Sequence, residues 1–291
     1  MKLIDYHIHT DLSGDSNAKL EDIVHTALKK NLSEIAITDH LEVIHSDGPY
    51  KTGNYDTTEP LFYPVKCVPP KLPINKDFSK LKEKIDTINE KNKGKIKVLF
   101  GVEISQADAD LEFSKSFIKK NPFDIVLCST HSLEKDIDLN YIDLSKCDIN
   151  DIYIKYLEKM YKQLNEFSDF DIISHINYII RYIYKDTKIR FDYSPYEDCL
   201  REIIKKIAHM QKGIEINTSG LFQGVNETFP SLWLVKIFKE YSGRIITVGS
   251  DAHDPEDIIR GYKYALELLK LAGFTKIASF EKRNIKFINI D

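Results

Sequence analysis

The stretch "KLIDYHIHT" (residues 2–10) decides how the rest of this sequence is interpreted. It begins as an apolar, strand-like run and ends with His7 and His9, two residues apart. Side chains at positions i and i+2 of a β-strand point to the same face, so the two imidazoles would converge on one point. This is the arrangement of two metal ligands. The alternative is a pair of half-buried histidines, and the other strands must distinguish the two.

Six further runs of this kind follow, separated by longer amphipathic segments. The seven runs span residues 2–9, 34–40, 96–105, 124–132, 171–177, 213–220 and 245–253. In segments between them, such as 20–28 and 200–207, the apolar residues fall on one helical stripe. Strands that alternate with helices predict an α/β fold with a parallel sheet.

Polar residues gather at the carboxyl ends of six of these runs. They are His7 and His9, Asp39 and His40, Glu103, His131, His175, and Asp251 and His253. In α/β barrels these strand ends open on one face and build the active site. The other histidines, His25 and His209 on helices and His45 in a polar loop, are expected to be solvated. So many agreeing strand ends favour a metal site over a structural histidine pair.

Imidazole and carboxylate ligands suit zinc, iron or manganese, and a site with this many of both should bind more than one ion. Asp39 keeps two interpretations, as a ligand or as a residue that orients a ligand histidine.

Composition excludes several classes of protein. The chain has 291 residues, 42% of them hydrophobic, and can form one large domain over 1–291. A net charge of −4 argues against a nucleic-acid partner. Neither a membrane span nor a signal peptide is visible in the sequence. The four cysteines (Cys67, Cys128, Cys147 and Cys199) are far apart, so we expect them to be reduced. We therefore expect a cytoplasmic protein; the number of subunits stays open.

Six motifs together resemble a known family. In order they are "YHIHT", "ITDH", "GVEIS", "STHSL", "SHIN" and "GSDAH". They resemble the motifs of the polymerase and histidinol phosphatase (PHP) family of metal-dependent phosphoesterases. The segments "HINYIIRY", "EINTSGL" and "VGSDAHDPEDI" are similar to its histidinol-phosphate phosphatase branch. Each motif is short, but six in register are specific.

The resemblance implies a distorted (β/α)7 barrel with three divalent transition-metal ions (zinc, iron or manganese). It implies a first site of His7, His9, Glu103 and Asp251, a second of Glu103, His131 and His175, and a third of His40, His253 and a loop residue. Glu103 would bridge the first two ions, and Glu103, Asp251 and His253 are the residues to which we assign catalysis. Many relatives have a histidine as the loop ligand, and the nearest match here is Asp15, which favours a harder metal. Its alternative interpretation is a turn residue.

Clustered ions lower the pKa of bound water to about 7 and bracket a phosphoryl group. A side-chain nucleophile is then unnecessary, and none is assigned to Cys128, Ser129 or Thr130. Arg181 lies where the matching motif places an arginine, and its planar fork suits phosphate oxygens. The alternative is a surface arginine paired with Asp186 or Asp192. Asn217 is expected to bind substrate or to support a ligand.

Residues 41–79 form a long aromatic segment with prolines and no sustained period. Loops of this length are usually functional or disordered. The segment leaves the strand end that carries His40, so we predict a lid insertion. Tyr50, Tyr55, Phe62 and Tyr63 are its candidates for packing on a substrate imidazole.

The predicted activity is hydrolysis of the small phosphomonoester L-histidinol phosphate in histidine biosynthesis. The alternatives are another phosphomonoester or a nucleotide 3′-end, an amidohydrolase, and a non-catalytic binding module. The amidohydrolases usually carry a bridging lysine where this chain has Glu103 and His131. The retained ligand set disfavours the binding module.

Overall fold

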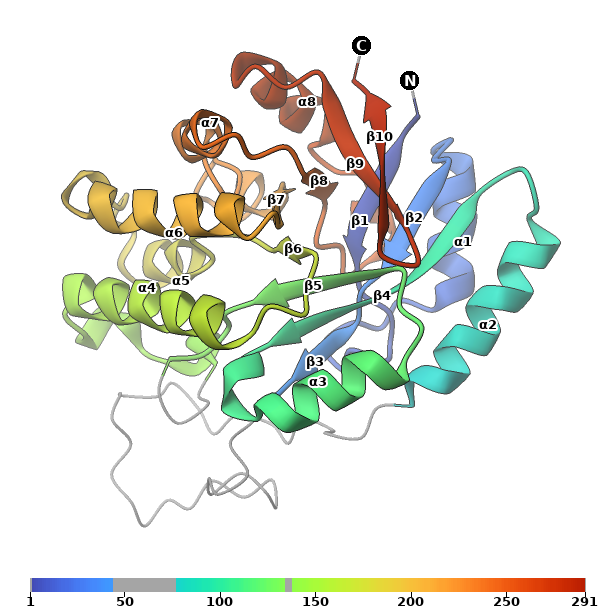
Figure 1. Cartoon of the computed structure of the whole chain (residues 1–291), viewed down its shortest axis with the longest axis horizontal. Coiled ribbons are helices and arrows are strands. Elements are labelled where there is room, and N and C mark those ends of the chain that lie inside the picture. The colour runs from blue at the N-terminus through green and yellow to red at the C-terminus, as the bar shows by residue number, and fades with distance from the viewer. Residues whose placement is uncertain (1, 44–76, 134–137, 291) are drawn as a thin grey trace.

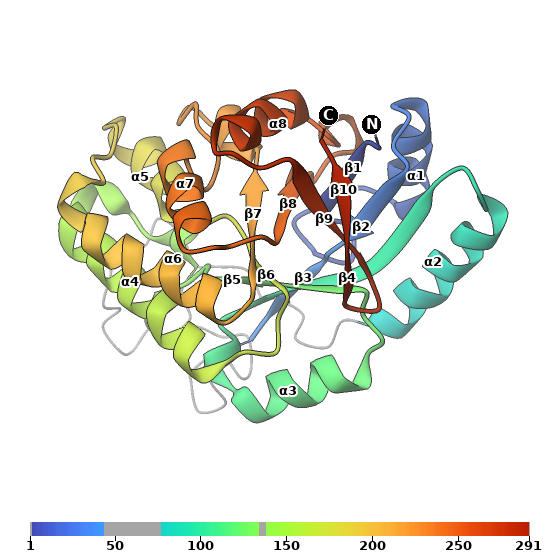
Figure 2. The same ribbon diagram turned by 45° about the horizontal axis from the view of Figure 1, so that its top comes forward.

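A barrel of parallel strands forms the centre of the protein (Figures 1 and 2). The computed structural model describes residues 2–43, 77–133 and 138–290. Strands follow the order β1-β2-β4-β5-β6-β7-β8, and short β3 pairs with β4 beyond the end of β2. The strands are β1 (Ile4–Ile8), β2 (Glu34–Ile37), β3 (His40–Glu42), β4 (Lys97–Ser105), β5 (Ile125–Ser129), β6 (Ile172–Ile173), β7 (Gly213–Asn217) and β8 (Ile246–Gly249). The α/β barrel prediction is confirmed.

The first and last strands nearly close the barrel. Ile8 forms a parallel bridge with Ala252, and the His9 amide donates to the Ala252 carbonyl over 2.9 Å. The Asp251 amide donates to the His7 carbonyl, also over 2.9 Å. These bonds place the last strand end directly beside the His7–His9 pair.

Helices cover the outside of the barrel (Figure 2). They are α1 (Leu20–Lys29), α2 (Phe78–Lys91), α3 (Leu111–Lys120), α4 (Ile149–Glu166), α5 (Ile179–Thr187), α6 (Glu197–His209), α7 (Leu232–Glu240) and α8 (Tyr262–Leu271). The predicted stripe on α6 is buried in full at Leu200, Ile203, Ile204 and Ile207. Burial of such stripes against an Ile-rich and Val-rich sheet is the main stabilising contribution to this fold.

Most observed strands are shorter than the predicted runs, and two of them differ most. The run 34–40 is divided into β2 and β3, since Thr38 and Asp39 interrupt it, and β3 continues to Glu42. The run 171–177 keeps only two residues in β6. Beyond it the chain turns sharply, with φ of 23° at His175 and 76° at Asn177.

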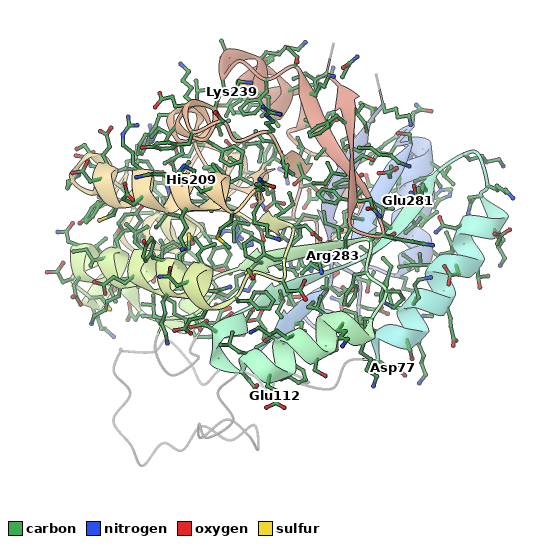
Figure 3. All side chains as sticks on the ribbon, in the orientation of Figure 1. Asp77, Glu112, His209, Lys239, Glu281 and Arg283 are labelled. Atoms are coloured by element: carbon green, nitrogen blue, oxygen red, sulfur yellow. The ribbon has the colours of Figure 1, made fainter. Side chains whose placement is uncertain are left out.

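A carboxyl-terminal hairpin was not predicted. Antiparallel β9 (Lys276–Glu281) and β10 (Asn284–Asn289) form this hairpin, and β9 packs against β1 and β2, where the Phe280 ring lies 6.3 Å from that of Tyr6 and Ser279 donates to Glu34. At the hairpin tip, the Arg283 amide donates to the Asp124 carbonyl and its side chain pairs with Asp171 (Figure 3). Because Asp124 and Asp171 precede β5 and β6, the hairpin spans the amino end of the barrel.

In the described residues, no helix is long and apolar enough to cross a membrane. Most of the predicted lid, including Tyr50, Tyr55, Phe62 and Tyr63, lies outside the described residues, as do His45 and Cys67.

Candidate metal centre

The carboxyl ends of the parallel strands bring the predicted ligands together. Glu103, near the end of β4, lies at their centre and is fully buried. It sits beside His40 in the β3–β4 register and beside Leu127 in the β4–β5 register. Its two carboxylate oxygens face different groups of side chains.

The first group contains four ligand atoms. His7 Nε2 lies 3.4 Å from Glu103 Oε2 and 3.7 Å from Asp251 Oδ1. His9 Nε2 lies 3.8 Å from Glu103 Oε2 and 3.3 Å from Asp251 Oδ1. Two ligands of one tetrahedral zinc ion are roughly 3.4 Å apart, given bonds of about 2.1 Å. The ligand atoms of His7, His9 and Asp251 lie within 4.8 Å of one another, and Glu103 Oε2 lies within 3.8 Å of both imidazoles.

The second group uses the other oxygen of Glu103. His131 Nε2 lies 3.2 Å and His175 Nε2 2.7 Å from Glu103 Oε1, and the two nitrogens are 3.4 Å apart. Glu103 thus presents one oxygen to each of these two groups, and its Oε2 also lies 2.6 Å from His40 Nδ1.

The third group is the most exposed. Asp15 Oδ2 lies 3.3 Å from His40 Nε2 and 3.1 Å from His253 Nε2. The Asp15 side chain is 55% exposed and that of His253 is 33% exposed. The structure therefore brings Asp15 to both histidines, and this group faces the mouth of the site.

Buried, unpaired ligand atoms test whether metal ions fit these groups. His7 Nε2 and His9 Nε2 have no hydrogen-bond partner among the described residues, and Glu103 Oε2 has only ion-pair contacts with imidazoles, the shortest of them 2.6 Å to His40 Nδ1. Polar atoms buried without partners are costly, and a cation between them removes that cost. Zinc, iron or manganese matches the donor set of nitrogen and oxygen. The side chains therefore fit a site for more than one divalent ion.

Charges in the centre are strongly coupled. Burial would raise the pKa of Glu103, but His131 and the other imidazoles outweigh it and hold that pKa well below its usual value. Burial lowers the pKa of His40, but Glu103 more than offsets this and the pKa rises to about 10. His9 has a pKa well below its usual value because of burial. A ligand must lose its proton to bind a metal, so metal uptake at His40 would release one.

Two carboxylates that were not predicted orient ligand histidines. Glu215 Oε1 lies 2.7 Å from His7 Nδ1, and Glu42 Oε1 lies 2.8 Å from His131 Nδ1. A carboxylate at Nδ1 fixes the tautomer and leaves Nε2 for the metal. Glu42 lies just beyond the predicted strand, and Glu215 lies inside an apolar one.

The contacts of Asp39 match its interpretation as a residue that orients a ligand histidine. Its carboxylate accepts hydrogen bonds from the Thr10 amide and hydroxyl and from the Ser13 hydroxyl, each over 2.7 Å. The Ser13 hydroxyl in turn contacts His9 Nδ1 at 3.0 Å. Asp39 thus supports the His9 ring through Ser13.

Arg181 lies at the mouth of the site rather than on the surface. Its side chain is 12% exposed, and Nη2 donates to Asp251 Oδ2 over 3.2 Å and to Ser219 Oγ over 2.9 Å. The guanidinium stacks over Tyr178, 4.4 Å from the ring centroid. Its buried Nε–H has no partner among the described residues.

Asn217 is engaged with its neighbours. Its Nδ2 donates to Glu215 Oε2 over 3.2 Å, and its Oδ1 accepts from the Ser219 amide and hydroxyl. These contacts correspond to its supporting role. The expected surface histidines, His25 and His209, are exposed.

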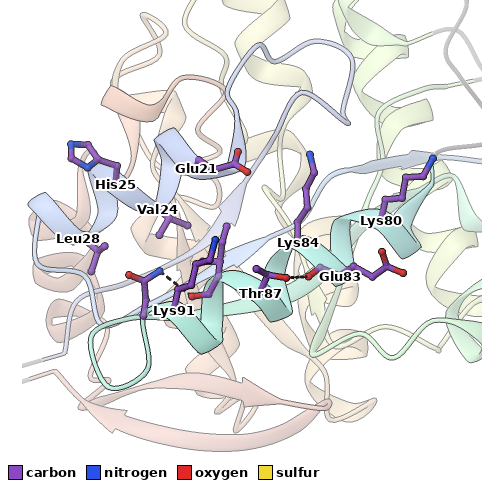
Figure 4. Close-up of a pocket in the computed structure, with 11 residues that line it drawn as sticks. Glu21, Val24, His25, Leu28, Lys80, Glu83, Lys84, Thr87 and Lys91 are labelled. Atoms are coloured by element: carbon purple, nitrogen blue, oxygen red, sulfur yellow. Dashed lines mark hydrogen bonds between the residues drawn. The ribbon is translucent and has the colours of Figure 1, made fainter.

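One hollow on the outside of the barrel has a different character from the metal centre. It lies between α1 and α2, with a volume of about 690 Å³ (Figure 4). Charged side chains of both signs line it, including Glu21 and His25 from α1 and Lys80 and Lys84 from α2. It contains none of the predicted ligands, so it is separate from the metal centre.

Together, the barrel and its strand-end ligand groups define a class: α/β-barrel hydrolases with a multinuclear metal site. More particularly, the chain belongs to the PHP domain family, whose model matches residues 5–219. This confirms the resemblance inferred from the six motifs.

Individual relatives cover nearly the whole chain. A Clostridium acetobutylicum protein described as a probable histidinol-phosphatase is 31% identical, over 98% of this chain and 99% of the relative. The Lactococcus lactis histidinol-phosphatase is 27% identical, over 98% and 97% respectively. The crystal structure of a histidinol phosphate phosphatase from Lactococcus lactis, complexed with zinc, L-histidinol and phosphate, has a TM-score of 0.79 and 26% identity. It covers 98% of this chain and 99% of the other.

Proposed function

We propose that this chain is a histidinol-phosphatase, which hydrolyses L-histidinol phosphate to L-histidinol and phosphate in histidine biosynthesis. Relatives of that name match from end to end at 25–31% identity. The similar Lactococcus lactis structure contains L-histidinol and phosphate, the two products of this reaction. The observation that carries the proposal is the complete set of strand-end ligands with Arg181 beside it.

The assignment of three ions follows the three groups. His7, His9, Glu103 and Asp251 would hold the first ion, Glu103, His131 and His175 the second, and Asp15, His40 and His253 the third. When bound, divalent ions supply hydroxide at neutral pH and neutralise charge on the phosphoryl oxygens.

The protein's own side chains place the substrate. Asp251 directs Oδ1 towards His7 and His9 and Oδ2 towards Arg181, so it joins the metal groups to the guanidinium. In the proposal the Arg181 guanidinium, whose Nη2 lies beside Asp251, donates to a phosphate oxygen. His253 donates from Nδ1 to the Asp251 carbonyl over 2.9 Å, which leaves Nε2 facing Asp15 at the exposed end of the site.

We also propose a small-molecule substrate rather than nucleic acid, and a cytoplasmic location. The net charge of −4 supports the first. The free thiols of Cys128, Cys147 and Cys199 support the second, because reducing compartments preserve them.

The test is phosphate release from histidinol phosphate, nucleoside monophosphates and sugar phosphates by purified, metal-analysed protein. We expect kcat/KM for histidinol phosphate to exceed that for every other substrate by more than tenfold. A smaller preference would contradict the assignment of histidinol phosphate as the substrate, but the protein would still be a phosphomonoesterase. Preferred release from a nucleotide 3′-end would favour the nucleotide alternative.

A further inference from the structure

One buried carboxylate of β7 contacts two residues that belong to different metal groups. Glu215 is 1% exposed, and its Oε1 lies 2.7 Å from His7 Nδ1. Its Oε2 accepts from the His175 amide over 2.9 Å and from Asn217 Nδ2 over 3.2 Å. His7 belongs to the first group and His175 to the second.

The contact with His175 is made to its main chain. His175 has a φ of 23°, in a region that residues other than glycine rarely adopt. Such a conformation persists only where its surroundings hold it. The bond from the His175 amide to Glu215 does so at the turn where β6 ends, and this turn directs the ring to Glu103.

The neighbouring strand β8 approaches Glu215 and His7 closely at Gly249. A Cβ atom at Gly249 would lie 2.1 Å from Glu215 Oε1 and 2.5 Å from His7 Cβ. Glycine is therefore required here, because any larger residue would displace the Glu215 carboxylate or the His7 side chain from their contact.

We propose that Glu215 is a positioning residue for two metal ions at once: it presents Nε2 of His7 to the first and holds the backbone of His175 for the second. This inference rests on the proposed ligand assignment. It does not depend on the substrate.

The hydrogen-bond pattern makes the role specific to a carboxylate. At Oε2, the backbone N–H of His175 and the Nδ2 group of Asn217 can only donate. At Oε1, His7 Nδ1 donates in the tautomer that leaves Nε2 for the metal, so both oxygens of Glu215 act as acceptors. A glutamine could satisfy only one side, and its NH2 group would oppose a donor on the other. Glu42 offers the matched contrast, because its Oε2 faces the Ser105 hydroxyl, which can donate or accept. Glu42→Gln can therefore keep both of its bonds.

The experiment titrates zinc into metal-free wild type, Glu215→Gln and Glu42→Gln, in competition with a chromophoric chelator. We expect Glu215→Gln to lower the zinc affinity of two of the sites by about 10- to 100-fold each. Glu42→Gln should lower the zinc affinity of only one site, by less than about tenfold. Thermal melting of the metal-free proteins reports any purely structural effect. A lower Tm with wild-type zinc affinity would overturn the proposal, and so would a loss confined to one ion.

A wild-type measurement covers the case in which Glu215→Gln does not fold. In zinc-loaded, ¹⁵N-labelled protein, His7 should show a slowly exchanging proton on Nδ1. A proton on Nε2 instead would contradict the proposal. Both readouts use zinc without substrate, so failure of the histidinol-phosphatase assignment would leave them unchanged.

Discussion

Arg181 has two interpretations, as a residue that binds the substrate phosphate and as a surface arginine, and they predict different kinetics. We expect Arg181→Ala to lower kcat/KM by roughly 10- to 100-fold, because it removes a charge-assisted interaction of about 1.5–3 kcal/mol with the phosphate. Arg181→Lys should recover only part of this loss in kcat/KM, since an ammonium group lacks the planar fork of a guanidinium.

Inhibition by free phosphate provides the independent measurement. The alanine variant should bind phosphate more weakly, in proportion to its kinetic defect. Wild-type kcat/KM together with unchanged phosphate inhibition would exclude Arg181 from substrate binding. Because Arg181 also contacts Asp251, metal content must be measured in each variant.

Two cysteines should differ in reactivity for reasons that are visible in the fold. Burial raises the pKa of the Cys128 thiol, whereas Cys199 on α6 is exposed. At pH 8, iodoacetamide followed by peptide mapping should label Cys199 quickly and Cys128 only in denaturant. The raised pKa favours folding below pH about 8.5, the pKa of an unfolded thiol, and this contribution is lost as the pH rises above it. Rapid labelling of native Cys128 would contradict this.

At the residue scale, the sequence alone locates the expected metal ligands better than the residues that orient those ligands. His131 and Asp251 stand at the ends of apolar runs, so their positions follow from strand periodicity. Glu215 stands within such a run, between Ile214 and Ile216, and its partner His7 is 208 residues away. Only the tertiary fold shows that pairing. A carboxylate at an inward position of a buried strand was the one available signal.

At the scale of elements, β4 supplies the side chain that joins two ions. Glu103→Ala should therefore lower the metal content by more than one equivalent per chain, whereas Asp15→Ala should lower it by one. Elemental analysis of metal-replete protein gives both values, with three equivalents expected for wild type. Full activity with a single bound ion would contradict the three-ion assignment.

The hairpin of β9 and β10 should stabilise the barrel without serving the site. Phe280 is 1% exposed, so Phe280→Ala should reduce the free energy of unfolding by about 3–5 kcal/mol. Phe287, in the same hairpin, is 48% exposed, and Phe287→Ala is the control, with a change within about 0.5 kcal/mol. Urea unfolding measures both. A loss of zinc affinity in folded Phe280→Ala would show that the two ends of the barrel are coupled.

Element boundaries were predicted less well than element order. The order follows from the alternation of apolar runs with amphipathic stripes, which each strand and helix carries locally. The division of 34–40 depends on Asp39, whose carboxylate binds Thr10 and Ser13 in another part of the chain. The hairpin depends on packing against Tyr6, 274 residues away from Phe280. Such long-range contacts leave no local pattern.

At the scale of the whole molecule, the metal centre and the core are separate. The apolar core runs through the barrel and its helices, while the ligands occupy the carboxyl ends of the strands. Removal of the ions leaves His7, His9 and Glu103 buried, but Glu215, Asp39 and Asp251 offer the imidazoles hydrogen bonds or opposite charge. The metal-free barrel should therefore stay folded.

Chelation tests this separation. Treatment with a strong chelator should abolish phosphate release while the far-UV circular dichroism at 25 °C is retained. The Tm should fall, because each ion that binds only the folded state at 100 times its Kd contributes about 2.7 kcal/mol. The exposed third group should lose its ion first, since Asp15 and His253 are open to solvent. Restored activity on adding zinc would show that the ligand groups persist without metal, whereas loss of the helical signal on chelation would mean that the ions hold the barrel together.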